Sequence, residues 1–318
     1  MYGCLAIIFT LLIVLGGGAS YVIFQLQQKG PLEETKNIVI AKGTGAGTIA
    51  YKLEKEGVIT SAYYFRIQYF LEREPELKAG EYLFTPYMTL AQVINKMARS
   101  DIVRRKVTVA EGRTTADVVR LLNAETSLTG QITVMPPEGS ILPDTYQLIL
   151  GDNRNDTIEE MQEAMLDVVT EIWALRDAEI PLRSPQELIT LASIIEKETG
   201  VAGERAKIAG VFYNRLNRNM MLQSDPTVTY GITLGRTPLG RSLTLDDLRT
   251  PTAYNTYSIV GLPPGPIACP GRAALMAAAK PEKNDYLFFV ANGKGGHSFA
   301  ATLAEHEKNV AVWRKMNK

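Results

Sequence analysis

Ser184-Pro-Gln-Glu-Leu-Ile-Thr-Leu-Ala-Ser-Ile-Ile-Glu-Lys-Glu-Thr-Gly200 is the stretch that decides how the second half of this chain folds. Ser184 is a typical helix N-cap, Pro185 is tolerated at the first helical position, and Glu187 completes a capping box. Apolar residues then recur at three- and four-residue spacing, and Gly200 gives a stop signal. The run therefore predicts a helix with one face packed into a core.

Two carboxylates, Glu196 and Glu198, lie at the end of this predicted helix. Helical projection places them about 160° apart, on opposite flanks of the apolar face, so periodicity does not choose between them. Partial burial and the negative end of the helix dipole both raise the pKa of a carboxyl group, toward values useful for proton transfer. Charged residues in a last helical turn are also commonly solvated surface. The helix alone therefore leaves a general acid and a surface cluster as alternatives.

Composition excludes some classes of function. The chain has 318 residues, enough for two domains, with 34 basic and 34 acidic residues and a formal net charge of zero. Its one short basic cluster, Arg104-Arg105-Lys106, is more typical of a solvated strand edge than of a phosphate track. We therefore expect no nucleic-acid partner. The two cysteines, Cys4 and Cys269, predict no disulfide framework.

The N-terminus predicts a membrane anchor. Residues 4–24 carry no charge, and about 20 apolar residues are enough to span a bilayer as a helix. A cleaved signal peptide is the alternative, but the apolar run continues past the small residues at 16–20, and no charged segment precedes it. We expect an uncleaved anchor over residues 1–24 and a polar linker over residues 25–37. The distribution of basic residues does not settle the orientation.

The rest of the chain reads as α+β followed by mainly helical structure. Residues 38–43 and 107–112 are similar alternating strands that end in glycine, and a helical pattern follows each, which suggests two related small α+β modules. Gly43-Thr-Gly-Ala-Gly47 lacks the ending of a phosphate loop and is interpreted as a turn. The remaining expected elements are helices at 157–175, 204–218, 273–279 and 303–315, a strand at 285–290, and an irregular stretch from 223 to 270.

Several long motifs occur in a fixed order. They are Glu138-Gly-Ser-Ile-Leu-Pro-Asp-Thr-Tyr146, Leu191-Ala-Ser-Ile-Ile-Glu-Lys-Glu-Thr199, Val211-Phe-Tyr-Asn-Arg-Leu216, Leu222-Gln-Ser-Asp-Pro-Thr-Val-Thr-Tyr-Gly231, Thr250-Pro-Thr-Ala-Tyr-Asn-Thr-Tyr257, Gly261-Leu-Pro-Pro-Gly-Pro-Ile267 and Gly293-Lys-Gly-Gly-His297. Together they resemble the endolytic murein transglycosylases of the MltG/YceG-like family. The resemblance covers the chain from about residue 38 to its end, plus the anchor.

The resemblance implies a single-pass protein of the bacterial inner membrane whose large C-terminal part is periplasmic. It implies LysM-like α+β modules over residues 38–135 and a mainly helical, lysozyme-like catalytic domain over residues 136–318. Such enzymes cleave nascent peptidoglycan between N-acetylmuramic acid and N-acetylglucosamine and leave a 1,6-anhydromuramoyl end, which terminates strand elongation. The implied partners are glycan strands, the lipid bilayer and peptidoglycan synthases.

The resemblance also assigns roles within the site. The family's catalytic residue corresponds to Glu198, the glutamate before Thr199, and Glu196 becomes a neighbouring, salt-bridging residue. Six polar or aromatic residues suit sugar hydrogen bonding and stacking: Gln223, Ser224, Tyr230, Tyr254, Asn255 and Tyr257. Each is equally compatible with a satisfied loop or core position. Asp225, before Pro226, is the nearest second carboxylate and is expected to cap a turn.

No cofactor or metal is expected. The two histidines, His297 and His306, lack the spacing and the convergent partners of a metal site, although His297 is a candidate for lining the cleft. Met221 stands where the family has a basic residue. Two competing functions stay open: a muramidase that hydrolyses the same bond with water, and a non-catalytic glycan-binding scaffold of the wall-synthesis machinery.

Overall fold

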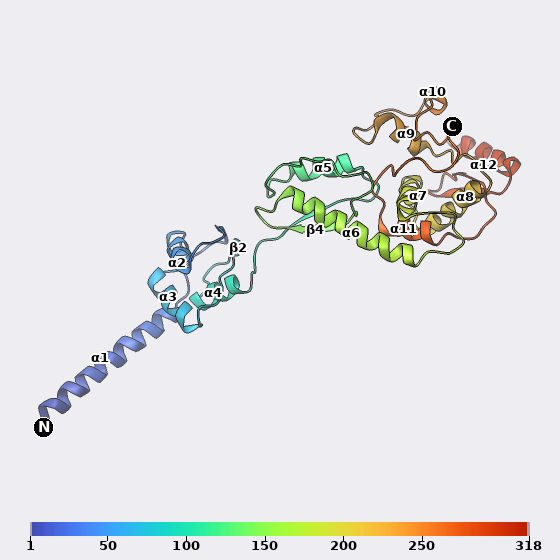
Figure 1. Cartoon of the computed structure of the whole chain (residues 1–318). Helices are drawn as coiled ribbons and strands as arrows, with labels where there is room; N and C mark the ends of the chain where they lie inside the picture. Colours follow the sequence, from blue (N-terminus) through green and yellow to red (C-terminus); the bar gives the residue numbers. More distant parts are fainter. Residues whose placement is uncertain (1, 317–318) are drawn as a thin grey trace. The chain divides into compact units, whose positions relative to one another are not determined.

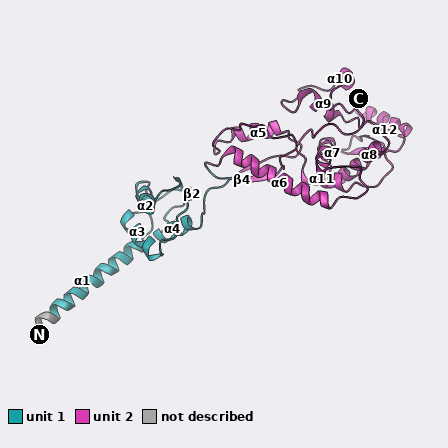
Figure 2. Cartoon of the chain, viewed as in Figure 1, with its two compact units in different colours: residues 1–105, 147–150 teal, residues 106–146, 151–318 magenta. Residues whose placement is uncertain are grey.

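The computed structural model describes residues 2–316. The chain divides into two compact units, residues 1–105 with 147–150 and residues 106–146 with 151–318 (Figure 2). The unit that holds the Glu196/Glu198 helix therefore begins at Lys106, earlier than the start at residue 136 that the sequence suggests for the catalytic domain. The second strand–glycine–helix repeat consequently belongs to the same unit as that helix.

Helix α1 (Tyr2–Gln27) begins the first unit. The segment of α1 from residue 6 to residue 27 is long and apolar enough to cross a membrane. Its described apolar side chains are mostly exposed. Toward its C-terminal end α1 contacts the following domain, where Leu26 packs against the core. An apolar helix with no protein around it is typical of a membrane span, which agrees with the predicted anchor.

The remainder of the first unit is a small α+β domain (Figure 1). Strands β1 (Lys36–Ile40) and β2 (Gly80–Phe84) pair antiparallel, with Ile38 opposite Tyr82. Helices α2 (Ala46–Lys55), α3 (Ala62–Leu71) and α4 (Leu90–Ala98) complete the domain. Its core is formed by the buried alternate residues of the strands together with the apolar stripes of the helices, among them Leu53, Phe65 and Ile94.

The second unit opens with a similar strand-and-helix arrangement. Strands β3 (Arg105–Thr108) and β4 (Thr145–Leu148) form a two-stranded sheet, of which residues 106–108 and 145–146 belong to this unit. The hydroxyl groups of Thr108 and Thr145 lie 2.9 Å apart across it. Helix α5 (Thr115–Ala124) follows β3, and a full capping box between Thr114 and Asp117 fixes its start. Helix α6 (Arg154–Ala174), expected at 157–175, carries a stripe of buried apolar residues from Ile158 to Ile172.

Three helices form the centre of the second unit (Figure 1). Helix α7 (Pro185–Glu198) contacts α8 (Arg205–Asn217) and α11 (Arg272–Ala279), and α6 also packs on α7 and α11. The shared core includes Leu191, Ile195, Phe212 and Leu275, all fully buried. This packing fixes the position of the carboxylate-bearing end of α7.

The stretch that the sequence leaves irregular contains regular structure. Helices α9 (Asp225–Thr233) and α10 (Leu245–Arg249) lie within residues 223–270. Strands β5 (Phe288–Ala291) and β6 (His297–Ala300) then form an antiparallel hairpin, of which only the first strand is foreseen, and α12 (Leu303–Met316) follows. The class is therefore mixed α+β, as expected, with more helix beside α7 than the sequence indicates.

Candidate active site

Helix α7 is buried around most of its circumference and not on a single face. Ser184 caps it by accepting a hydrogen bond from the Glu187 N–H, but the Glu187 carboxylate accepts from Arg183 N (2.6 Å), one residue before the cap. The expected reciprocal capping box is thus displaced by one residue. The helix ends at Glu198, and the extended conformation of Thr199 terminates it in place of a left-handed glycine.

Glu198 is the last residue of α7, and its carboxyl group meets the segment that precedes α9. The hydroxyl of Ser224 donates a hydrogen bond to Oε1 of Glu198 at 2.5 Å. Burial raises the pKa of Glu198 to about 7. The Ser224 hydrogen bond opposes this rise, and the negative charge of Asp225 adds to it. A carboxylic acid with a pKa near neutrality suits general acid–base catalysis.

Ser224 is held by two buried threonines. It is only 1% exposed, and its N–H donates to Thr256 Oγ1 (2.9 Å), while its carbonyl accepts from Thr227 Oγ1 (2.6 Å). The hydroxyl groups of Thr227 and Thr256 lie 2.8 Å apart. The sequence places Ser224 among sugar-binding residues; the structure buries it and directs its hydroxyl to Glu198. Thr227 and Thr256 are missed by sequence reasoning, although both lie within the quoted motifs.

Asp225 begins α9 and does not cap an isolated turn. Its Oδ1 accepts a hydrogen bond from the hydroxyl of Tyr257 at 2.6 Å. Asp225 thus stands next to Ser224 in the chain and close enough to Glu198 for its charge to affect the carboxyl group. Tyr257, a predicted sugar-binding residue, is brought to the same place by this bond.

Arg215 on α8 orders the segment that leads to Ser224. Its guanidinium is buried and donates to the carbonyls of Met221, Leu222 and Leu287 and to Oε1 of Gln223 (3.1 Å). Gln223 has a φ of 53°, in the left-handed region that non-glycine residues seldom adopt. Arg215 therefore stabilises a strained turn immediately before Ser224.

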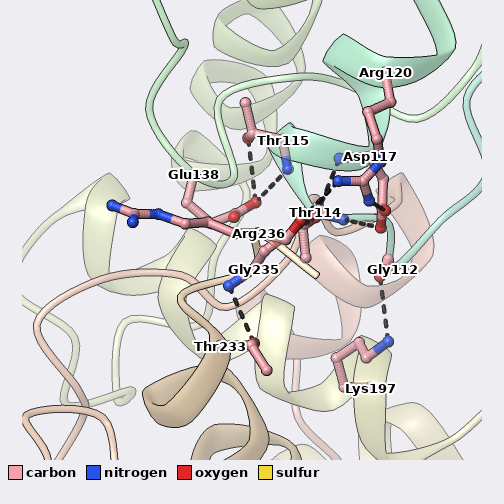
Figure 3. A network of polar contacts seen from close by, with 10 residues as sticks. All are labelled: Gly112, Thr114, Thr115, Asp117, Arg120, Glu138, Lys197, Thr233, Gly235 and Arg236. Carbon is pink, nitrogen blue, oxygen red and sulfur yellow. Dashed lines mark hydrogen bonds and ion pairs between the residues drawn. The ribbon is translucent and has the colours of Figure 1, made fainter. Parts of the chain in front are cut away.

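Tyr230 and Tyr254 lie together, with ring centroids 4.8 Å apart. The hydroxyl of Tyr230 donates to Oε2 of Glu138 (3.3 Å), whose Oε1 accepts from the N–H and hydroxyl of Thr115. Figure 3 shows Glu138 with Thr115 at the start of α5. Burial is the main cause that raises the pKa of Glu138. The two predicted aromatic residues thus form a pair that is anchored on the Glu138 motif.

Residues 38–312 match the YceG-like family. The chain belongs to this family.

Relatives with assigned names agree with this membership. The endolytic murein transglycosylase of Bacillus subtilis (strain 168) is 30% identical over 333 residues, which cover 93% of this chain and 90% of that protein. The endolytic murein transglycosylase of Streptococcus pneumoniae (strain ATCC BAA-255 / R6) is 27% identical over 361 residues, covering 96% of this chain and 64% of that longer protein. The crystal structure of a YceG-like protein from Listeria monocytogenes has a TM-score of 0.51 and 31% identity, covering 87% of this chain and 99% of that one.

In this YceG-like protein Glu196 is held by different partners from those of Glu198. Oε1 of Glu196 lies 3.1 Å from the guanidinium of Arg205, and its Oε2 accepts from Gly271 N (3.0 Å). The Glu196 side chain is only 5% exposed, and Arg205 also approaches Glu111 at 3.5 Å. Glu196 is therefore an ion-paired residue between α7, α8 and α11. Arg205 was not singled out from the sequence, although it lies nine residues after Glu196.

Asn255 requires a correction to the sequence-based interpretation. It is fully buried, its amide donates to the carbonyls of Leu248 (3.0 Å) and Thr250 (2.7 Å), and its Oδ1 accepts from Tyr257 N (2.9 Å). No polar atom of its side chain is left for a sugar. Asn255 instead ties α10 to the loop that carries Tyr254, Thr256 and Tyr257.

His297 is paired with a residue that the sequence did not suggest. Its ring Nδ1 lies 2.7 Å from Oε2 of Glu204, and its backbone N–H donates to Oε1 of the same carboxylate. Burial alone would raise the pKa of Glu204, but the hydrogen bonds from His297 outweigh burial and hold it below its usual value. The charge of His297 also lowers the pKa of Glu198. Within residues 2–316, no three His, Cys, Asp or Glu side chains converge as a metal site would need.

Proposed function

We propose that this YceG-like protein is an endolytic murein transglycosylase and that Glu198 is its acid and base. The observation that carries the proposal is the contact between Glu198 and Ser224, which holds a desolvated carboxyl group at the end of a buried helix. The named relatives from Bacillus and Streptococcus support murein as the substrate.

The reaction needs one carboxyl group and no water. Protonated Glu198 gives its proton to the glycosidic oxygen between N-acetylmuramic acid and N-acetylglucosamine, and the bond from that oxygen to C1 breaks. The Glu198 carboxylate then takes the proton of the muramoyl 6-hydroxyl, whose oxygen bonds to C1 and closes a 1,6-anhydro ring. The atoms balance, because the proton lost in the first step returns in the second. Intramolecular attack supplies the proximity that a bound water would otherwise need.

The pKa of Glu198 supports both steps. A pKa of about 7 leaves the group protonated often enough to act as an acid and basic enough to accept the second proton. Ser224 fixes which way the carboxyl group points. Tyr257, which is bonded to Asp225, and Gln223, which precedes Ser224 in the chain, are proposed to contact the sugars together with Tyr254. The positive charge that develops at C1 during bond cleavage is stabilised by the negative charges of Asp225 and of Glu198 once it is deprotonated.

Product analysis tests this proposal. The full-length protein in detergent micelles is incubated with isolated glycan strands, in parallel with the variants Glu198→Gln and Glu196→Gln. The products of all three are identified by mass spectrometry. We expect the wild type and Glu196→Gln to produce anhydro ends. We expect Glu198→Gln to produce none. Ends that have gained one water would show a muramidase. If the wild type cleaves nothing and Glu198→Gln binds glycan as well as the wild type does, the protein is a glycan-binding scaffold.

We further propose that α1 anchors the protein in the inner membrane and that the second unit lies on the periplasmic side. The exposed apolar surface of α1 supports a span, and murein as substrate supports the orientation. Protease added to spheroplasts should then digest the second unit without lysis. Protection until the membrane is broken would contradict this orientation.

The α+β domain of the first unit is proposed to be a LysM-like glycan-binding module, and the second unit a lysozyme-like catalytic domain. A cavity of about 740 Å³ in the first unit is lined by Tyr63, Tyr69 and Phe70, and aromatic rings suit sugar faces. Tyr63→Ser with Phe70→Ser should weaken glycan binding without changing the product. Equal binding by this double variant and the wild type would contradict the LysM-like role.

A further inference from the structure

Two adjoining cavities of the second unit form a groove along α5. The first has a volume of about 240 Å³ and is lined by Lys197 and Tyr230, among others. The second, of about 700 Å³, follows α5 and the strand before it. Both are lined by Asp117, Thr237 and Pro238, so they adjoin at these three residues. They are called the α5 groove below.

The α5 groove begins beside the proposed catalytic residues. Lys197, which lines the first cavity, directly precedes Glu198 in α7, and Pro226 directly follows Asp225 in α9. The groove then runs away from the site toward the second cavity, whose apolar lining includes Val109 and Leu121. A strand bound at Glu198 would therefore lie one residue along α7 from the lining of the first cavity.

The charges that line the α5 groove are unbalanced. Its one acidic lining residue among those described is Asp117, which is already ion-paired with Arg120 (Figure 3). Among the residues that the structure describes, Lys197 donates a hydrogen bond only to the carbonyl of Gly112 (3.3 Å). The exposed Arg113 lines the second cavity. Within residues 2–316 neither Arg113 nor Lys197 forms an ion pair. The groove thus presents one free cation in each cavity, with apolar walls between them.

We propose that the α5 groove binds the acidic peptide stem of the murein strand that is cleaved at Glu198. This inference rests on the proposed function. A peptide stem carries several carboxylates separated by small aliphatic side chains, which matches two cations set along an apolar groove. Lys197 meets a carboxylate near the muramoyl ring, and Arg113 meets one farther along the stem. The glycan contacts then belong to the α7–α9 side of the site and the peptide contacts to α5.

Binding to two forms of one substrate tests the proposal. The full-length Glu198→Gln protein, which cannot turn over, is titrated with glycan strands that keep their stems and with the same strands after an amidase has removed them. We expect the stem-bearing strands to bind about tenfold more tightly, with a preference that shrinks as salt rises. Arg113→Met with Lys197→Met should abolish the preference. Arg113→Lys with Lys197→Arg should keep most of it, and Lys308→Met, on the exposed face of α12, should keep all of it.

Equal affinity of the protein for both kinds of strand would overturn the proposal. So would a double Met variant that weakens binding to both strands alike, since the groove would then hold sugars. Failure of the proposed function is separate: it appears as absence of anhydro products when the wild type meets stem-bearing strands, which are the strands expected to bind best. A preference for stem-bearing strands without any cleavage would support peptide binding in the α5 groove and contradict the proposed transglycosylase activity.

Discussion

The hydroxyl of Ser224 lies 2.5 Å from Oε1 of Glu198 and joins the end of α7 to the start of α9, 26 residues later in the chain. This bond favours the charged form of a carboxyl group whose burial favours the neutral one. The balance leaves the pKa of Glu198 at about 7, so small changes around it should move the pH profile in directions that can be worked out in advance.

Ser224→Ala removes a hydrogen bond that stabilises the Glu198 carboxylate. The pKa of Glu198 should rise, so the alkaline limb of kcat/KM, near pH 7 in the wild type, should move up by about one pH unit. The rate on the acid side should fall roughly tenfold, because the carboxyl group loses its fixed direction. Initial rates of anhydro-end formation from pH 5 to 9 measure both effects. Ser224→Thr is the control, and a limb that stays in place in Ser224→Ala would contradict the assignment.

Asp225→Asn should move the same limb the other way. The negative charge of Asp225 raises the pKa of Glu198, so its removal should lower that pKa and shift the alkaline limb below pH 7. Asparagine still accepts the hydrogen bond from Tyr257, which keeps the local geometry. The paired profiles of Ser224→Ala and Asp225→Asn are the measurement. Shifts of the same sign in both variants would rule out Glu198 as the titrating group.

Glu196→Gln should cost stability and leave the pH profile in place. It removes one partner of an ion pair in which the Glu196 side chain is 5% exposed and that of Arg205 is 11% exposed. A buried guanidinium that loses its partner destabilises a protein, here by about 2 kcal/mol because Glu111 remains nearby. Thermal unfolding should show the loss, and the alkaline limb should stay near pH 7. A lost limb with unchanged unfolding would make Glu196 the acid.

The sequence predicts α7 within a residue, because caps and apolar periodicity are local signals. It also predicts α6, α8, α11 and α12 from apolar periodicity, and the apolar helix α1 from its long uncharged run. What it leaves open is the choice between Glu196 and Glu198, since both flank one apolar face. That difference comes from residues distant in the chain or in other elements, Arg205 and Gly271 for one and Ser224 for the other. Contacts between elements are set by tertiary packing, which periodicity does not encode.

The irregular stretch shows the same limit. Its Pro, Gly, Asn and Thr residues predict loops, yet two helices form there. Helix α9 buries Thr227, Val228 and Tyr230, and a capping box between Thr244 and Asp247 fixes the start of α10. Asn255 shows this limit most clearly, because an asparagine side chain can form hydrogen bonds with a sugar or with backbone groups. The carbonyls of Leu248 and Thr250 and the N–H of Tyr257 use the Asn255 side chain for backbone hydrogen bonds.

Asn255→Ala should therefore act on the fold of the site and not on sugar contacts. It leaves two part-buried hydrogen bonds to carbonyls and the one from the Tyr257 N–H unmade, which costs about 2–3 kcal/mol. The rate should fall as well, because the loop carries Tyr254, Thr256 and Tyr257. Thermal unfolding beside Asn217→Ala, an exposed control on α8, measures the loss. Full stability with weakened glycan binding would restore Asn255 as a sugar contact.

Glu198→Gln should stabilise the protein above neutral pH. In the folded protein the pKa of Glu198 is about 7, against 4.5 for the free side chain, so the folded state holds this proton more tightly than the unfolded state. The stability contributed by the bound proton is full below about pH 4.5 and is lost as pH rises through 7. Glutamine does not titrate and stays neutral, and it still accepts from Ser224.

The variant and the wild type should thus unfold alike at pH 4, diverge between pH 4.5 and 7, and differ by about 2–3 kcal/mol at pH 8, with the variant more stable. Denaturant unfolding at each pH measures the difference, and Glu187→Gln at the start of α7 is the matched control. A constant offset across this range would mean that Glu198 is ionised in the folded protein throughout. In that case it would not carry the proton that cleavage of the glycosidic bond requires.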